Sequence, residues 1–252
     1  MVTGLDIFRA HFRNYADRYV LIGGAACDIA MTSAGLEFRA TKDLDIVLCI
    51  EVMDGEFVQA FWEFVRSGGY QVQEKSTGQR QFYRFYKPTN KDYPFMLELF
   101  SRQPDVLQVA AGSHLTPLPI EEELSSLSAI LMDNDYYAFI RAGKTEVDGL
   151  PVVGPAHLIA LKARAWLDLT EREKKGEKID SKVIKKHKND VFRLYRILDP
   201  AIDPAAPEVV KKDLQEFISR MDNEDIDLKS LGVRSVTRDG VLAELAKVYR
   251  LG

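Results

Sequence analysis

Residues 20–48 read VLIGGAACDIAMTSAGLEFRATKDLDIVL, and this stretch decides the fold of the first half of the chain. A short apolar run ends in two glycines, a segment rich in small residues follows, and the chain returns in a second apolar run that contains Asp43-Leu44-Asp45. Successive side chains of a β-strand point to opposite faces, so Asp43 and Asp45 would share one face while Leu44 points into a core. The pattern predicts a strand, a glycine turn, a helix and a second strand with two adjacent carboxylates.

The paired aspartates indicate a cation site. Aspartate is disfavoured in strands, and the apolar neighbours of this pair indicate a central strand, so a solvated edge is the weaker interpretation. Two adjacent carboxylates repel each other unless a cation lies between them. Hard oxygen ligands at a strand end, close to a turn at Gly23 and Gly24, suit Mg²⁺ that holds a phosphate chain. Arg39 and Lys42 are candidate phosphate contacts, and the alternative for each is a plain surface charge.

A third acid is expected on a neighbouring strand, because two Mg²⁺ ions need more oxygen ligands than two aspartates provide. Glu98 is the candidate, since it is the lone acid in the apolar segment PFMLELF at residues 94–100. Its alternative reading is one outward-facing residue on a half-exposed strand. Beside the two aspartates, the metal-ligand reading of Glu98 is favoured.

The composition is that of a soluble globular chain. It has 252 residues, 46% hydrophobic and 29% charged, with a net charge of −4, so the molecule as a whole does not resemble a nucleic-acid-binding protein. Residues 171–196 hold an excess of Lys and Arg, which leaves a local basic face possible. The N-terminus lacks the apolar core of a signal peptide, and Cys27 and Cys49 are expected to be buried thiols in a reducing cytoplasm.

Hydrophobic periodicity predicts the remaining elements. Helices are expected at 5–17, 25–34, 55–69, 156–170 and 182–198, with two more toward the C-terminus. Strands are expected at 18–22, 42–50, 70–72, 80–87 and 94–100, and a hairpin is expected from 136–141 and 150–153. The predicted fold class is α+β, with a mixed sheet flanked by helices in residues 1–115 and a mainly helical part in residues 116–252.

The order of these residues resembles the DNA polymerase β-type nucleotidyltransferase superfamily. In that resemblance Gly23 and Gly24 match the turn that approaches the triphosphate, Asp43 and Asp45 match the metal-binding pair, and Glu98 matches the third acid, which also helps to activate the incoming hydroxyl. Gly24 stands where a serine is often found, so one hydroxyl contact is lost while backbone N–H groups can still cradle phosphate. The resemblance implies an NTP substrate such as ATP and two Mg²⁺ ions.

The second half is similar to the AbiEii/AbiGii-toxin type of nucleotidyltransferase. The similarity lies in HLIALK at 157–162 and KNDVFRL at 188–194. It implies that Lys162 and Asp190 lie across a cleft from the metal acids, with Lys162 neutralising phosphate charge and Asp190 positioning the lysine or the acceptor. From the residues alone, Lys162 reads as a snorkelling helix lysine and Asp190 as a solvated charge.

The expected activity is therefore Mg²⁺-dependent transfer of an NMP from an NTP to an acceptor hydroxyl. The resemblance implies an RNA acceptor, with transfer RNA one candidate, and a toxin-like protein with a cognate antitoxin. The basic residues 182–196 would suit a phosphate backbone. Two alternatives stay open: a small-molecule nucleotidyltransferase of the antibiotic-modifying kind, which the acidic pI of 5.7 favours, and a non-catalytic nucleotide-binding protein of the same fold.

Overall fold

The computed structural model describes residues 2–72, 82–100 and 133–252. The chain forms two compact units, each considered by itself below. The first holds Met1–Ile120 and Lys144–Val153, and the second holds Glu121–Gly143 and Gly154–Gly252. The predicted boundary between residues 115 and 116 lies outside the described residues. The α+β class predicted from the sequence is confirmed, with a mixed sheet in the first unit and helices in the second.

The first unit is built on a sheet in the order β3-β4-β5-β2-β1-β7-β6, counted over the described residues. The strands are β1 (Tyr19–Ile22), β2 (Asp43–Leu48), β3 (Gln71–Val72), β4 (Phe82–Tyr86), β5 (Met96–Phe100), β6 (Lys144–Val147) and β7 (Leu150–Val153). β2 runs parallel to β5 and β1 runs parallel to β7, while the other neighbours are antiparallel. The central strands β1 and β2 are apolar along most of their length, as strands covered on both faces require.

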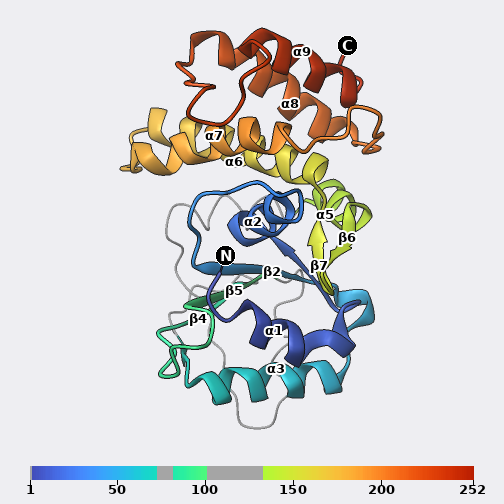
Figure 1. Cartoon of the computed structure of the whole chain (residues 1–252), viewed down its shortest axis with the longest axis vertical. Helices are drawn as coiled ribbons and strands as arrows, with labels where there is room; N and C mark the ends of the chain where they lie inside the picture. The colour runs from blue at the N-terminus through green and yellow to red at the C-terminus, as the bar shows by residue number, and fades with distance from the viewer. Residues whose placement is uncertain (1, 73–81, 101–132) are drawn as a thin grey trace. The chain divides into compact units, whose positions relative to one another are not determined.

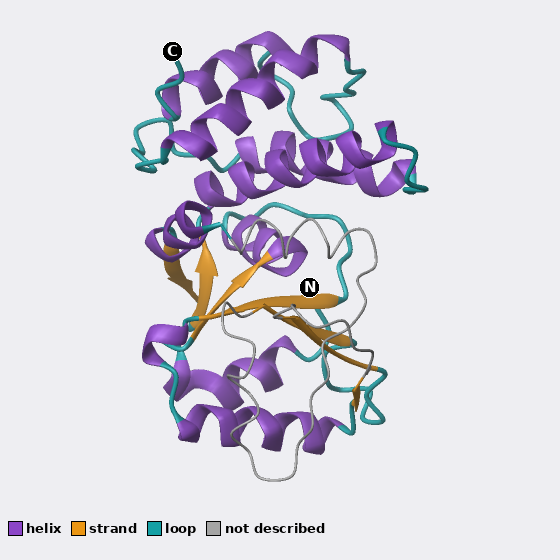
Figure 2. Ribbon diagram, turned by 180° about the vertical axis from the view of Figure 1, so that it is seen from behind, coloured by secondary structure: helices purple, strands orange, loops and turns teal. Residues whose placement is uncertain are grey.

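Helices cover both faces of this sheet (Figures 1 and 2). α1 (Leu5–Phe12) and α3 (Gly55–Gly68) lie on one face, and α2 (Gly23–Ser33) lies on the other. α3 begins where the Asp54 side chain accepts a hydrogen bond from the Phe57 N–H, and it ends at Gly69, whose φ of 63° closes the last turn. Aromatic rings such as Phe12 and Phe64, 5.2 Å apart between centroids, fill the space between α1 and α3.

The second unit is helical (Figure 1). Among its described residues the α-helices are α5 (Asn134–Ala142), α6 (Pro155–Lys174), α7 (Ser181–Tyr195), α8 (Glu208–Arg220) and α9 (Arg238–Val248). Pro155 occupies the first turn of α6, where its missing N–H costs no hydrogen bond, and Asp180 caps α7. α6 packs against both α7 and α8, and the Trp166 ring meets the Phe217 ring edge-on at 5.4 Å.

The predicted strand at 136–141 is wrong. These residues belong to α5, because Asp133 caps the helix start by accepting from the N–H groups of Asp135 and Tyr136. The buried side chains Tyr136 and Ile140 then fall on one side of the helix. The hairpin exists, but its first strand is β6 rather than 136–141.

No helix among the described residues has the length and apolar character needed to cross a bilayer. Cys27 and Cys49 are both buried, as the sequence predicted, and neither forms a disulfide.

Candidate active site

The acids predicted from the sequence meet on one face of the sheet. Asp43 and Asp45 are two residues apart on β2, and the parallel register with β5 pairs Asp45 with Glu98. Registered residues of neighbouring strands point to the same face, so the three carboxylates form a cluster. Glu98 is 5% exposed, whereas both aspartates are partly exposed. The cluster therefore combines a buried acid with two acids that solvent reaches.

The glycine turn presses against this cluster. Gly23 follows β1 with a φ of 65°, a left-handed conformation that favours glycine. A Cβ at Gly23 would lie 1.8 Å from Oδ2 of Asp45, so a larger residue has no room there. The Gly24 N–H donates to the same Oδ2 at 3.3 Å. The first turn of α2 thus directs a backbone donor at the carboxylate, in the arrangement that also binds anions at helix starts.

Arg84 on β4 forms an ion pair with the buried carboxylate of Glu98 on the neighbouring strand β5. The antiparallel register places Arg84 opposite Glu98, and its Nε and one terminal nitrogen donate to Oε1 of Glu98 at 3.1 and 2.9 Å. Both side chains are almost fully buried. A buried carboxylate needs such a partner, because an unpaired charge inside a protein is costly.

Glu98 nevertheless holds its proton more tightly than an ordinary glutamate. Burial raises its pKa well above the usual value, and the negative charge of Asp45 and a hydrogen bond with Asp45 raise it further. The Arg84 guanidinium acts in the opposite direction, and Asp43 adds a smaller raising effect. Three carboxyl groups thus share one guanidinium, and the cluster lacks the positive charge needed to balance all three when they are ionised.

The donor set fits a divalent cation in its chemistry. Asp43 and Asp45 offer hard carboxylate oxygens on one face of a strand, and a cation would supply the positive charge that the cluster lacks. As they stand, no three His, Cys, Asp or Glu side chains in the described ranges form a ready metal site. Glu98 is engaged by Arg84, and Asp45 by the Gly24 N–H.

The candidate phosphate contacts lie in the segment that leads into β2. A Cβ on Gly24 would meet Oγ1 of Thr41 at 2.7 Å and a guanidinium nitrogen of Arg39 at 3.7 Å. Arg39 therefore lies beside the glycine turn, where the sequence expected it. The Lys42 amino group lies 5.8 Å from the centre of the Phe95 ring instead. Its predicted contact with a triphosphate stays a prediction.

Lys162 and Asp190 lie in the second unit and pair with each other. The Lys162 amino group is 3.5 Å from Oδ2 of Asp190, and Arg193 donates to Oδ1 of the same carboxylate at 3.1 Å. The side chains of Lys162 and Asp190 are 6% and 0% exposed. Two cations thus balance one buried acid, and the role predicted for this pair toward the metal acids stays a prediction.

No family model matches the chain, and no curated protein matches it. Five chains of solved structures are similar to it, and two of them are described here. An antigenic nucleotidyltransferase-like protein from Paracoccidioides brasiliensis is 13% identical, with 95% of this chain and 98% of that chain covered and a TM-score of 0.45. JHP933 from Helicobacter pylori is 13% identical, with coverages of 98% and 90% and a TM-score of 0.35. At this identity and TM-score neither structure assigns a function to the chain.

Sequence reasoning missed two members of this neighbourhood, Arg84 and Thr41. Arg84 carries the same signal that marked Glu98, a lone charge within an apolar strand segment, here RQFYRFYK at 80–87. Thr41 shares the alternation of Asp43 and Asp45, so it points toward the glycine turn. Thr41 could have been found by extending the two-residue alternation of β2, whereas the place of Arg84 depends on the register between β4 and β5.

Proposed function

We propose that this protein is a metal-dependent nucleotidyltransferase, which moves an NMP from an NTP to an acceptor hydroxyl. One observation carries the proposal: the Gly23 turn packs directly against Asp45, with 1.8 Å between the position of a Gly23 Cβ and the carboxylate. A backbone that close to paired acids places phosphate-binding N–H groups and cation-binding oxygens side by side. A nucleotide triphosphate with its divalent cation needs both kinds of group at one point.

In this proposal the acids bind the metal ion, and the groups around the glycine turn bind the phosphates. Asp43 and Asp45 would hold Mg²⁺, with Glu98 as the third acid, and the cation would supply charge neutralisation for the phosphates and a lowered pKa for the acceptor hydroxyl. The N–H groups at the start of α2 face the phosphate chain. Arg39 lies beside them and adds positive charge. Lys162 and Asp190 keep the roles that the sequence implied.

The reaction is a substitution at phosphorus. The acceptor oxygen forms a bond with the α-phosphorus, the bond from that phosphorus to the oxygen of the β-phosphate breaks, and pyrophosphate leaves with the bonding electrons. The acceptor proton passes to the carboxylate of Glu98, whose pKa is raised by burial and by the charge of Asp45, so that it binds a proton more tightly than an ordinary glutamate. Arg84 fixes the orientation of that carboxylate through two hydrogen bonds.

RNA is the proposed acceptor, with transfer RNA as one candidate, in a toxin-like enzyme of the AbiEii type that a cognate antitoxin would control. A small-molecule hydroxyl is the alternative acceptor. A non-catalytic nucleotide-binding protein is the alternative outside enzymes, and the adjacent acids Asp43 and Asp45 argue against it, because a chain without catalysis has no physical need to hold paired carboxylates.

The test is the substitution Asp45→Asn, with Asp135→Asn as the matched control on an exposed first turn of α5. The protein is incubated with Mg²⁺, each α-labelled NTP and total RNA, and the labelled RNA is quantified. We expect Asp45→Asn to lower transfer at least 100-fold, because a neutral amide binds Mg²⁺ poorly. Its stability toward urea should not fall, since one repelling charge beside Glu98 is gone. The control should keep full activity.

Three outcomes decide the proposal. Label on RNA that disappears with Asp45→Asn supports it. Label on a small hydroxyl compound and none on RNA keeps the nucleotidyltransferase but replaces its acceptor. Transfer that survives Asp45→Asn, or no transfer to any acceptor with any NTP, overturns the assignment of the site.

A further inference from the structure

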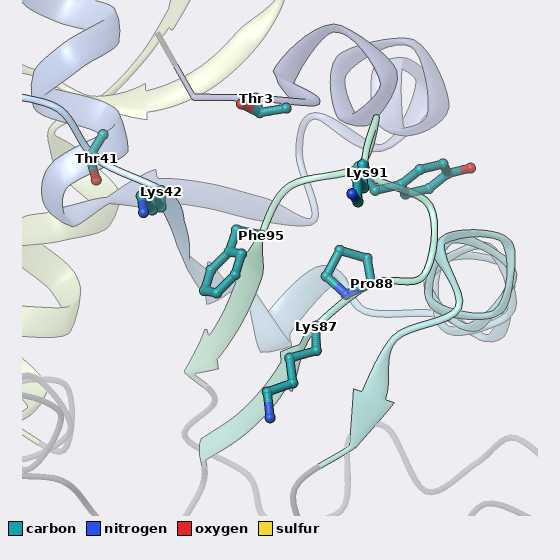
Figure 3. Close-up of a pocket in the computed structure, with 8 residues that line it drawn as sticks. Thr3, Thr41, Lys42, Lys87, Pro88, Lys91 and Phe95 are labelled. Atoms are coloured by element: carbon teal, nitrogen blue, oxygen red, sulfur yellow. The ribbon is translucent and has the colours of Figure 1, made fainter.

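A pocket of about 470 Å³ opens at the sheet edge where β2 and β5 begin (Figure 3). Its wall includes three lysines, Lys42, Lys87 and Lys91, and the aromatic rings of Tyr93 and Phe95. Phe95 lies at the middle of the group, between Lys42 and Pro88 (Figure 3). The volume of the pocket is typical of sites that bind small organic ligands, and it is large enough for one nucleotide.

The aromatic ring at the centre of the pocket is exposed. Phe95 is 49% exposed, whereas most other phenylalanines of this unit with described burial lie in the core and Phe38 is half-buried. The exposed ring offers a flat apolar face on which another ring can stack. The Lys42 amino group lies 5.8 Å from its centroid, so a flat group stacked on Phe95 would meet a cation beside it.

The pocket lysines are available for an anion. All three are exposed, and none of them forms a salt bridge with a carboxylate of the described residues. Lys87 also has a φ of 48°, a strained backbone for a residue that is not glycine, directly after β4. The basic helix α7 differs, because Lys188 there binds Glu224 and Arg193 binds Asp190. The pocket gathers its three lysines around one aromatic ring, whereas on α7 only exposed lysines such as Lys182 and Lys185 are left for an anion.

Most of the pocket wall lies on the face of the sheet opposite the acid cluster, and Thr41, which lies beside the glycine turn, links the two at the strand ends. Lys42 immediately precedes Asp43, and Phe95 immediately precedes Met96, which is paired with Asp43. Side chains alternate along a strand, so Lys42 and Phe95 point away from the acids. The neighbouring contacts agree: Phe85, next to Arg84 on β4, packs on Phe61 of α3, while Asp45 faces the start of α2.

A ligand that occupies both the pocket and the acid cluster must be longer than one nucleotide. A compact NTP held at the Gly23 turn has no reason to reach around the strand ends to the opposite face. A single strand of RNA that lies across this edge would reach both, with one nucleotide in the pocket and its terminal hydroxyl at the acids. An acidic peptide would satisfy the lysines but offers no regular partner for the Phe95 ring.

We propose that this lysine–phenylalanine pocket binds a nucleotide of a single-stranded RNA acceptor. The base stacks on Phe95, and the flanking phosphates contact Lys42, Lys87 and Lys91. The inference rests on the proposed function, because it names the acceptor of the same active site. Base stacking on aromatic rings and phosphate contacts with lysines together bind single strands without demanding one sequence.

The experiment measures binding of fluorescein-labelled 12-nucleotide RNA by anisotropy, without NTP or Mg²⁺, over a series of salt concentrations. Phe95→Ala should weaken binding roughly tenfold, and Phe95→Tyr should bind within about twofold of the wild type, because it keeps the stacking face. The pair Lys87→Ala/Lys91→Ala should weaken binding and reduce the slope of log K against log salt by about 1.4, or 0.7 for each lost phosphate contact. Lys229→Ala, an exposed lysine of the second unit, is the control and should change neither quantity.

The same variants separate this inference from the proposed function. Asp45→Asn should bind RNA like the wild type, so a failure of transfer and a failure of RNA binding are distinct results. Wild-type binding that survives both Phe95→Ala and the double lysine variant overturns the pocket assignment, as does a wild type that does not bind RNA. Loss of NTP affinity in the pocket variants, with RNA affinity intact, would overturn it too.

Discussion

Gly23 is the residue on which the site depends, because it meets two separate demands. Its φ of 65° disfavours any side chain, and its missing Cβ leaves the space that Asp45 occupies. Gly35 meets only the first demand, since its φ is 71° and no atom lies within 4 Å of the position of a Cβ. The two glycines therefore allow backbone strain to be separated from the contact with the acid.

We expect Gly23→Ala to lower the free energy of unfolding by about 3 kcal/mol, from left-handed strain and from overpacking against Asp45. Gly35→Ala should lower it by only about 1 kcal/mol, because strain acts alone there. Urea unfolding of both variants gives the difference. Transfer activity should be lost with Gly23→Ala and kept with Gly35→Ala. Equal losses of stability would show that the acid does not crowd the turn.

At the scale of elements, β4 and β5 are joined by the buried pair of Arg84 and Glu98 in addition to their backbone ladder. Removing one member of a buried ion pair leaves the other charge without compensation, whereas replacing both is far less costly. The pair should therefore behave as a unit in stability measurements.

The substitution Arg84→Met should lower the free energy of unfolding by about 3 kcal/mol at pH 7, because Glu98 then loses both hydrogen bonds and its counter-charge. The double variant Arg84→Met/Glu98→Gln should recover at least half of that loss, since no buried charge remains. A double-mutant cycle from urea unfolding measures the coupling. Additive losses from Arg84→Met and Glu98→Gln would contradict the pairing.

Much of the fold was predictable because each element carries its own periodicity. The strand at 94–100 and the helices at 55–69 and 182–198 were placed within a few residues of β5, α3 and α7. The segment 136–141 was assigned to the wrong class, because its aromatic residues fit strand propensity while the helix depends on a cap at Asp133. The hydrogen bonds that Asp133 accepts at the start of α5 therefore outweigh the strand propensity of residues 136–141.

The site was predictable to the extent that it follows from alternation within a strand. The adjacency of Asp43 and Asp45 needs only the two-residue period of β2, and it follows from the sequence. The pairing of Arg84 with Glu98 needs the register between β4 and β5, which the connecting turn sets and no periodicity reveals. For the same reason the pocket around Phe95 was not visible from the sequence, because three separate segments form its wall.

At the scale of the whole molecule, the chain returns to the sheet after it has begun the helical unit. The hairpin of β6 and β7 belongs to the first unit, and β7 pairs in parallel with β1. A fragment of residues 1–115 would therefore lack the strand that covers one edge of β1. Exposed apolar edge strands promote aggregation.

We expect the fragment 1–115 to be insoluble or aggregated, and the fragment 1–153 to be soluble, because only the longer one contains β6 and β7. Size-exclusion chromatography and circular dichroism of both fragments test this. A monomeric 1–115 fragment with strand content and a cooperative thermal transition would show that β7 is not needed to complete the sheet.

The return of this hairpin also sets an order of events during synthesis. β1 ends at Ile22 and β7 begins at Leu150, so about 130 residues are made between the two partners. At the usual 5–20 residues per second, one side of β1 waits roughly 6–26 seconds on the ribosome before its neighbour exists. During that time the strand YVLI is a hydrophobic edge without a partner. During synthesis this strand edge is therefore open to pairing with other chains until β7 has been made.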